Sequence, residues 1–202
     1  YSVARHHPLK VGVRVPTHPD AAAGLGMDAV AWAREGLIDM LVVTPFWTTS
    51  DFDIPLELWR KQLGAANERV ILAAGLEHNL RAFPGAPAVP NDLASTRGFM
   101  VSSLQRGAYQ IYLFNFMDSE TRPVSQLDYR QLIQDGSNWD AICRKPRRHV
   151  ICFRDTVPPG FPNGAQLPVE TVQPAEFELH TGPTVSEADI AVLIGLADRP
   201  GV

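Results

Sequence analysis

The chain has 202 residues, of which 45% are hydrophobic, and this is enough to build a real core in one mid-sized domain or two small ones. Its 18 basic and 22 acidic residues give a formal net charge of -4 without a long run of either sign, so no electrostatic footprint for nucleic acid is present. No apolar run approaches the roughly 20 residues that cross a bilayer, and no signal-peptide pattern begins the sequence.

Four short β-branched runs alternate with helical patterns over the first 118 residues. Near-continuous apolar strands that alternate with helices are typical of a parallel sheet covered by helices. Asp28 and Asp53 are the predicted N-caps of two of the helices. The predicted strands are 10–15, 39–44, 70–76 and 110–116, and the predicted helices are about 20–25, 28–35, 54–63 and 92–106.

The pattern changes towards the C-terminus. Four apolar or β-branched runs, at 149–153, 168–172, 175–179 and 191–196, are separated by loops rich in proline and glycine. Such spacing predicts strands of a small antiparallel β-sandwich-like segment. We therefore expect three parts: four βα units in residues 1–118, a connecting segment without an obvious amphipathic helix in 119–146, and the sandwich-like segment in 147–202.

Cys143 and Cys152 are the only cysteines of the chain, which excludes a disulfide-rich scaffold and a zinc site made of cysteines alone. They are expected either to pair across two strands in an oxidising compartment or to remain reduced core thiols. The chain begins at Tyr1 rather than at a methionine, and we expect a processed or truncated piece of a larger protein. The sequence does not determine the cellular compartment, and a secreted or periplasmic parent protein is one of the alternatives.

Three stretches in chain order carry a resemblance to a known family: VGVRVP at 11–16, GLGMDAVAWAREGLIDMLVV at 24–43 and GAYQIYLFNFMD at 107–118. They resemble the second half of the TIM-type (β/α)8 barrel in uncharacterised bacterial glycoside hydrolase-like (family-10-like) proteins. The resemblance covers about residues 8–118. It implies that the four predicted strands correspond to barrel strands five to eight and that a β-sandwich follows them.

The resemblance also implies that the first four strands of the barrel are absent from this chain. A closed barrel has no unpaired strand edge, whereas half a barrel exposes two. We therefore expect an N-terminal barrel half or a second chain as a partner, or a piece cut from a larger enzyme. An open four-stranded sheet with the C-terminal strands over one edge is a further alternative.

Polar residues follow each of the four predicted strands. Active sites of barrel enzymes lie at the C-terminal ends of the strands, so these residues should converge on one face. The convergence matters more than any single residue, because each has an ordinary structural explanation. The four groups are Arg14, Thr17 and His18; Thr44, Trp47, Asp51 and Asp53; Glu77, His78 and Asn79; and Asn115 with Asp118.

Glu77 is the predicted catalytic residue. It ends the third predicted strand, and the resemblance makes this the seventh barrel strand, from which many retaining barrel glycosidases project their nucleophile. A retaining mechanism needs a second carboxyl at about 5 to 5.5 Å and an inverting one at about 6.5 to 9.5 Å. By the same resemblance that carboxyl would come from the absent fourth strand. The competing interpretation of Glu77 is a solvated or salt-bridged glutamate at a strand end.

The predicted substrate-binding residues are Arg14, Trp47, His78, Asn115 and Asp118. Arg14 is unusual in an apolar strand and is expected to pair with a carboxylate in the barrel mouth. Asp118 could supply that carboxylate or hold a sugar hydroxyl, and Trp47 could stack on a sugar ring or pack within the protein. For His78, donation to the substrate competes with simple solvation.

The predicted function is hydrolysis of O-glycosyl bonds in a carbohydrate by carboxylate acid/base chemistry. No metal or other cofactor is predicted, and motifs of serine hydrolases, P-loop proteins, zinc proteases and dinucleotide-binding proteins do not occur. The isolated chain is expected to lack a complete catalytic pair. The alternative is a non-catalytic carbohydrate-binding or surface-assembly protein on a degenerate barrel, and a third reading is a stable proteolytic core.

Overall fold

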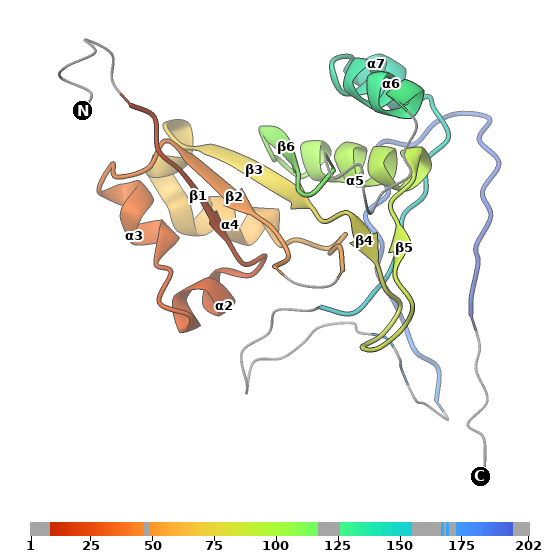
Figure 1. The fold of residues 1–202 in the computed structure, drawn as a ribbon, viewed down its shortest axis with the longest axis horizontal. Coiled ribbons are helices and arrows are strands. Elements are labelled where there is room, and N and C mark those ends of the chain that lie inside the picture. Colours follow the sequence, from red (N-terminus) through yellow and green to blue (C-terminus); the bar gives the residue numbers. More distant parts are fainter. Residues whose placement is uncertain are drawn as a thin grey trace.

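The computed structural model describes residues 9–46, 49–116, 126–154, 167, 169 and 173–195. A four-stranded parallel sheet lies at its centre, with the strands in the order β1, β2, β3 and β6 (Figure 1). In register, Arg14 is paired with Val42, Val42 with Ala73, and Ala73 with Gln110. The parallel α/β prediction is confirmed. The strands are β1 Gly12–Val15, β2 Met40–Val43, β3 Ile71–Leu76 and β6 Gln110–Leu113.

Helices occupy each connection between successive strands of the sheet. Asp28 and Asp92 begin two of them as N-caps, since their carboxylates accept hydrogen bonds from the backbone N–H groups of Ala31 and Ser95. Within the described ranges, no helix combines the length and apolar character needed to cross a membrane. The helices are α2 Pro19–Gly24, α3 Ala29–Arg34, α4 Leu56–Leu63, the 3-10 helix η1 Gly64–Glu68, and α5 Leu93–Gln105.

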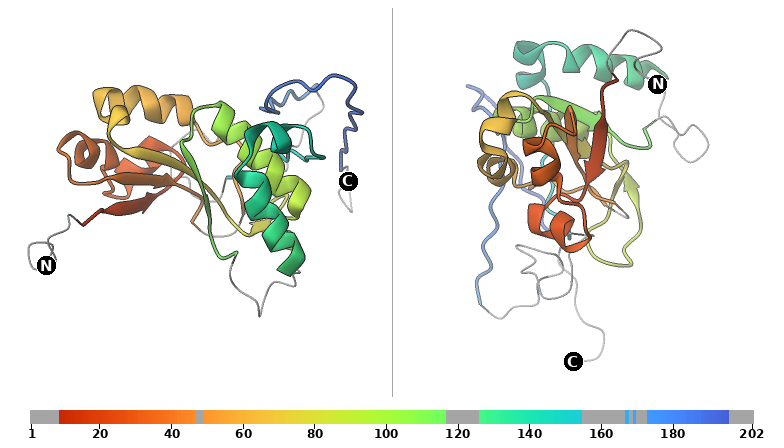
Figure 2. Two further views of the ribbon diagram at one scale, coloured as in Figure 1. Left: turned by 90° about the horizontal axis from the view of Figure 1, so that it is seen from above. Right: turned by 90° about the vertical axis from the view of Figure 1, so that its left-hand side faces the viewer.

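The core lies between these helices and one face of the sheet. Parallel strands that are added in chain order by right-handed connections place their helices on the same side. Figure 2 shows α2, α3 and α4 together on one side of β1. Alternate strand residues such as Val15, Val43 and Ala74 are fully buried there, and Trp59 of α4 and Phe99 of α5 pack into the same cluster.

The remaining strand residues lie on what we call the second face of the sheet. This face carries Arg14, Val42, Ala73, Gly75 and Tyr112, because side chains alternate along a strand. None of the five belongs to the helix-side core cluster. The second face is therefore distinct from the helix-side core, and its residues differ in character from the apolar residues of that core.

Asp53 does not cap α4, so this prediction is wrong. The N-cap position belongs to Pro55 and has no side-chain hydrogen bond. The Asp53 carboxylate instead forms ion pairs with Arg106 at 3.4 Å and Arg154 at 2.9 Å. Arginines that lie far away in sequence compete successfully for this carboxylate.

Two helices occupy the described part of the 119–146 range, which the sequence predicts as a connection. They are α6 Gln126–Gly136 and α7 Trp139–Cys143. α6 packs on α5, and Asp135 of α6 pairs with Arg97 of α5 at 2.7 Å. A further small sheet is formed by β4 Asn79–Leu80 and β5 Val89–Pro90, which are antiparallel.

Among the described residues, the predicted strands at 149–153, 175–179 and 191–195 are not formed, whereas the predicted strand at 168–172 lies outside them except for residue 169. Residues 148–152 bond instead to the first part of the chain: the Arg148 N–H donates to the Ala94 carbonyl at 2.9 Å, and the Cys152 thiol donates to the Ser50 carbonyl at 2.6 Å. In the predicted run at 191–196, the side chains of Val192 and Leu193 are 78% and 89% exposed, so they have no packing partner among the described residues. Cys143 and Cys152 are both free thiols, so the expected alternative of a disulfide is not formed.

Candidate functional site

A group of buried polar side chains gathers beside the C-terminal ends of the strands. Each of them is at most 7% exposed, although buried polar groups are uncommon unless they are hydrogen-bonded. Three of the four strand-end groups predicted from sequence contribute to it. The members are Thr17, Thr44, Thr49, Ser50, Asp51, Glu77, His78 and Asn91.

Glu77 directly follows β3 and is 3% exposed. Its backbone carbonyl accepts two hydrogen bonds, from the Ser50 hydroxyl and from the Asn91 side-chain amide, each at 2.7 Å. Its carboxylate oxygen Oε1 accepts a hydrogen bond from the backbone N–H of His78 at 3.0 Å. The catalytic residue predicted from sequence is therefore held in a fixed position by two loops. It is not a solvated glutamate.

Ser50 and Asn91 form a clamp around residues 77–79. The Asn91 amide donates to the Ser50 hydroxyl at 2.7 Å, so the two clamp residues also bond to each other. The backbone N–H groups of Ser50 and Asn91 donate to the carbonyls of Asn79 and His78, both at 2.8 Å. Sequence reasoning missed the clamp, because neither residue stands next to a strand run and each is of a type that is common in loops.

Asp51 is a second buried carboxyl at this edge of the sheet. Burial raises its pKa above the ordinary range, while the nearby Arg154 guanidinium and the hydrogen bonds from the Asp53 N–H and from Thr17 oppose this shift. The ion pair with Arg154 is 3.4 Å long. Asp51 therefore connects the strand-end loop to the segment around residue 154, and its contacts are with Thr17, Asp53 and Arg154.

Arg14 lies on the second face with its guanidinium between two aromatic rings. Its central carbon is 3.7 Å from the ring centre of Phe114 and 4.7 Å from that of Phe46, which are cation–π distances. One nitrogen donates to the Pro45 carbonyl at 3.3 Å. The carboxylate partner predicted for Arg14 is not found among the described residues. Asp118, a candidate for that partner, and Trp47 lie outside them.

His78 is 7% exposed, so its alternative reading as a solvated histidine is wrong. Its ring meets the Phe116 ring edge-on, with centroids 6.4 Å apart. Asn115 adopts a left-handed backbone conformation with a φ of 58°, which asparagine tolerates better than most residues. This turn after β6 returns Phe116 to the strand ends, while the Asn115 side chain itself is exposed.

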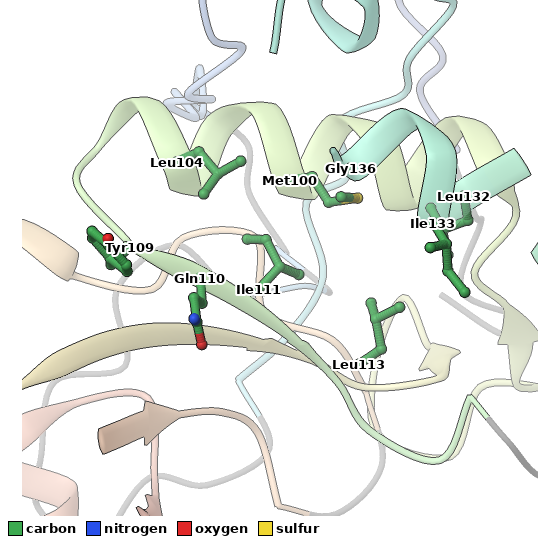
Figure 3. Close-up of a pocket in the computed structure, with 9 residues that line it drawn as sticks. All are labelled: Met100, Leu104, Tyr109, Gln110, Ile111, Leu113, Leu132, Ile133 and Gly136. Atoms are coloured by element: carbon green, nitrogen blue, oxygen red, sulfur yellow. The ribbon is translucent and has the colours of Figure 1, made fainter. Parts of the chain in front are cut away.

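A cavity of about 320 Å³ lies away from this polar group, between α5, β6 and α6 (Figure 3). Its walls include Leu104, Ile111 and Leu132, and the buried carboxylates do not line it. Ile111 and Leu132 also belong to, or pack against, the helix-side core. The cavity is therefore a packing feature at the β6 edge. Among the described residues, no group of three or more histidines, cysteines or acids is placed to hold a metal ion.

The comparisons with known proteins add no relative. No family model matches the chain, and no curated protein matches it significantly. The resemblance to glycoside hydrolase-like barrels thus remains a prediction that rests on the three stretches of sequence given above.

Proposed function

We propose that the chain is one half of a (β/α)8 barrel that takes part in glycoside hydrolysis, with Glu77 as a catalytic carboxylate. The order of the strands supports the barrel half. Four parallel strands follow one another in space as in the sequence, with their helices on one side, and this is how a (β/α)8 barrel is built. β1 and β6 are the outermost strands of the described sheet, as they would be in half a barrel.

The observation that carries the proposal is the position of Glu77. Catalytic groups of barrel enzymes lie at the C-terminal ends of strands, and they act best when neighbouring hydrogen bonds fix their geometry. Glu77 has both properties, because it directly follows β3 and the Ser50–Asn91 clamp holds its backbone. A glutamate with a purely electrostatic role at the surface would need neither burial nor the clamp.

Two carboxyl groups are needed to hydrolyse a glycosidic bond. One donates a proton to the leaving oxygen, and the other attacks the sugar carbon or activates a water. Glu77 takes the attacking role. Asp51 is engaged with Thr17 and Arg154, so we assign the proton donor to a carboxyl from a complementary barrel half, either an N-terminal half or a second chain. The chain alone then binds a carbohydrate without cleaving it.

A non-catalytic carbohydrate-binding protein is the second candidate. The partly buried rings of Phe46 and Phe114 beside the strand ends favour it, since aromatic rings provide apolar platforms for sugars. Such a protein would bind the sugar on the second face of the sheet and would need no second carboxyl group. Surface assembly on a degenerate barrel belongs to the same class.

Binding and cleavage assays separate the two candidates. The chain is titrated with a panel of oligosaccharides while its tryptophan fluorescence is followed, and reducing ends are counted in the same samples. The assay is then repeated with the chain joined to a complementary half. Cleavage only in the joined protein supports the hydrolase. Binding without cleavage in both samples favours the binding protein, and absence of binding in both contradicts either function.

A further inference from the structure

Arg14 reaches across the sheet to the opposite edge. β1 and β6 are separated by β2 and β3, yet the Arg14 guanidinium contacts the ring of Phe114, the residue after β6. The Arg14 side chain therefore extends over the second face between these two strands. Thr44 lies on the central strands beneath this reach, where a Cβ atom at Gly75 would overlap the Thr44 side chain.

The hydrogen-bonding capacity of this guanidinium exceeds what the described residues use. A guanidinium has five N–H donors, and the hydrogen bond to the Pro45 carbonyl, at 3.3 Å, is long. Its Nε atom is buried and has no hydrogen-bond partner in the described structure. The rings of Phe46 and Phe114 stabilise the charge but accept no conventional hydrogen bond from these donors.

Glu77 lies at the same end of the sheet as Phe114. The two residues directly follow the paired strand ends Leu76 and Leu113, and the Phe114 N–H donates to the carbonyl of Leu76, next to Glu77, at 3.0 Å. Phe114 is the ring on which the Arg14 guanidinium stacks. A sugar bound at Glu77 would thus have a cation within the reach of its substituents.

We propose that Arg14 binds the oxyanion of an acidic sugar, so that the carbohydrate bound at this site is a uronic acid-containing or sulfated saccharide. The inference rests on the proposed function and specifies its substrate class. Arginine suits this role because its planar fork matches the oxygens of a carboxylate or sulfate. The two rings hold the fork in place before the ligand arrives, which lowers the ordering cost of binding.

Calorimetric titration of the chain with three matched trisaccharides tests this inference. One is a galacturonate trimer, one a sulfated galactose trimer and one a neutral galactose trimer, and each is measured at low and high salt. We expect the acidic trimers to bind at least about tenfold more tightly than the neutral one, as one charge-assisted pair would give. Added salt should reduce this preference. The arm with the larger preference distinguishes carboxylate from sulfate.

Arg14→Met keeps an apolar stem against the two rings and should lose the preference for the acidic trimers. Arg14→Lys keeps the charge but lacks the planar fork of the guanidinium, so it should retain only part of the preference for acidic trimers. Arg34→Gln removes a charge from an exposed site on α3 and should change nothing. Thermal unfolding confirms that each variant folds, and if the Met variant does not, the Lys variant decides.

Equal affinity of the chain for acidic and neutral trimers would overturn this inference and leave the proposed function intact. A folded Arg14→Met or Arg14→Lys variant with the full acidic preference would overturn it as well. Failure of all three trimers to bind would contradict both the inference and the function.

Discussion

Asp51 and Asp135 are both buried, yet their surroundings shift the two pKa values in opposite directions. Burial raises the pKa of Asp51 more than Arg154 and its hydrogen bonds lower it. Burial acts in the same sense on Asp135, but hydrogen bonds from Lys145, Gln131 and Arg97 outweigh it, so the pKa of Asp135 falls. The stability of the protein should therefore depend on these two groups in opposite ways.

We predict that Asp51→Asn and Asp135→Asn have opposite pH profiles. A raised pKa gives stability that is present below the unfolded pKa and lost as pH rises through the folded one, so Asp51→Asn should gain on the wild type as the pH rises from about 4 towards neutral. A lowered pKa gives the reverse, so Asp135→Asn should lose most at neutral pH and approach the wild type in acid. Urea denaturation over this range measures both, and parallel profiles would contradict the assignment.

Sequence reasoning can find residues that stand at a strand end but not the residues that hold them. Glu77, His78 and Arg14 stood out because a polar residue interrupts or ends an apolar run. Ser50 and Asn91 stand 41 positions apart, and only the folded chain brings their hydroxyl and amide together. Their residue types occur in most loops, so no local signal distinguishes them.

The segment 147–154 is held against α5 by a close approach of backbone to helix. A Cβ atom at Gly98 of α5 would overlap the carbonyl oxygen of Arg148. The Arg148 N–H donates to the carbonyl of Ala94, one turn earlier on α5. Glycine at position 98 therefore serves the packing of two elements rather than the helix itself.

We predict that Gly98→Ala destabilises the protein by about 1 to 3 kcal/mol, which is the usual cost of an overpacked site. Gly136→Ala in α6 is the matched control, because its new methyl group would meet only the flexible end of Met100. Gly136 is the last residue of α6, so alanine there should change the free energy of unfolding much less than alanine at position 98. Chemical denaturation gives both free energies of unfolding, and equal effects would contradict the proposed packing.

Strand predictions succeeded where a neighbour in the chain supplied the partner strand. The runs that became β1, β2 and β3 are each joined to the next by a single helical connection, so each finds its partner strand in the adjacent βα unit. The run at 191–196 has the same composition, but Ile194 is 77% exposed and no described strand pairs with it. An alternating apolar pattern indicates which segments are able to form a β-strand. Whether a partner strand lies beside such a segment depends on the whole fold.

At the scale of the molecule, the outer edges of β1 and β6 pair with no other described strand. Such edges add strands from other chains unless charge or a covering segment prevents it. We predict that the chain associates with itself as its concentration rises, since a second copy offers the same edges. Tyr112→Lys places a charge on β6, on the second face, and should weaken this association.

Sedimentation velocity over a range of concentrations measures the effect. Leu25→Lys is the matched control, because Leu25 is an exposed apolar residue at the end of α2 and is not part of an edge strand. It should leave association unchanged. A chain that remains monomeric at all concentrations, or a Tyr112→Lys variant that associates as the wild type does, would contradict the role of the edges.

We claim that the clamped Glu77 performs chemistry on a sugar, and glycoside turnover by the chain joined to a complementary barrel half measures this activity. Glu77→Gln keeps the shape of the side chain, so we predict little change in KM and a fall in kcat of about 10²- to 10⁴-fold. Glu57→Gln is the control: it removes an exposed carboxylate of α4 that pairs with Arg106, and the variant should keep the wild-type kcat. A folded Glu77→Gln protein with the wild-type kcat would contradict the claim.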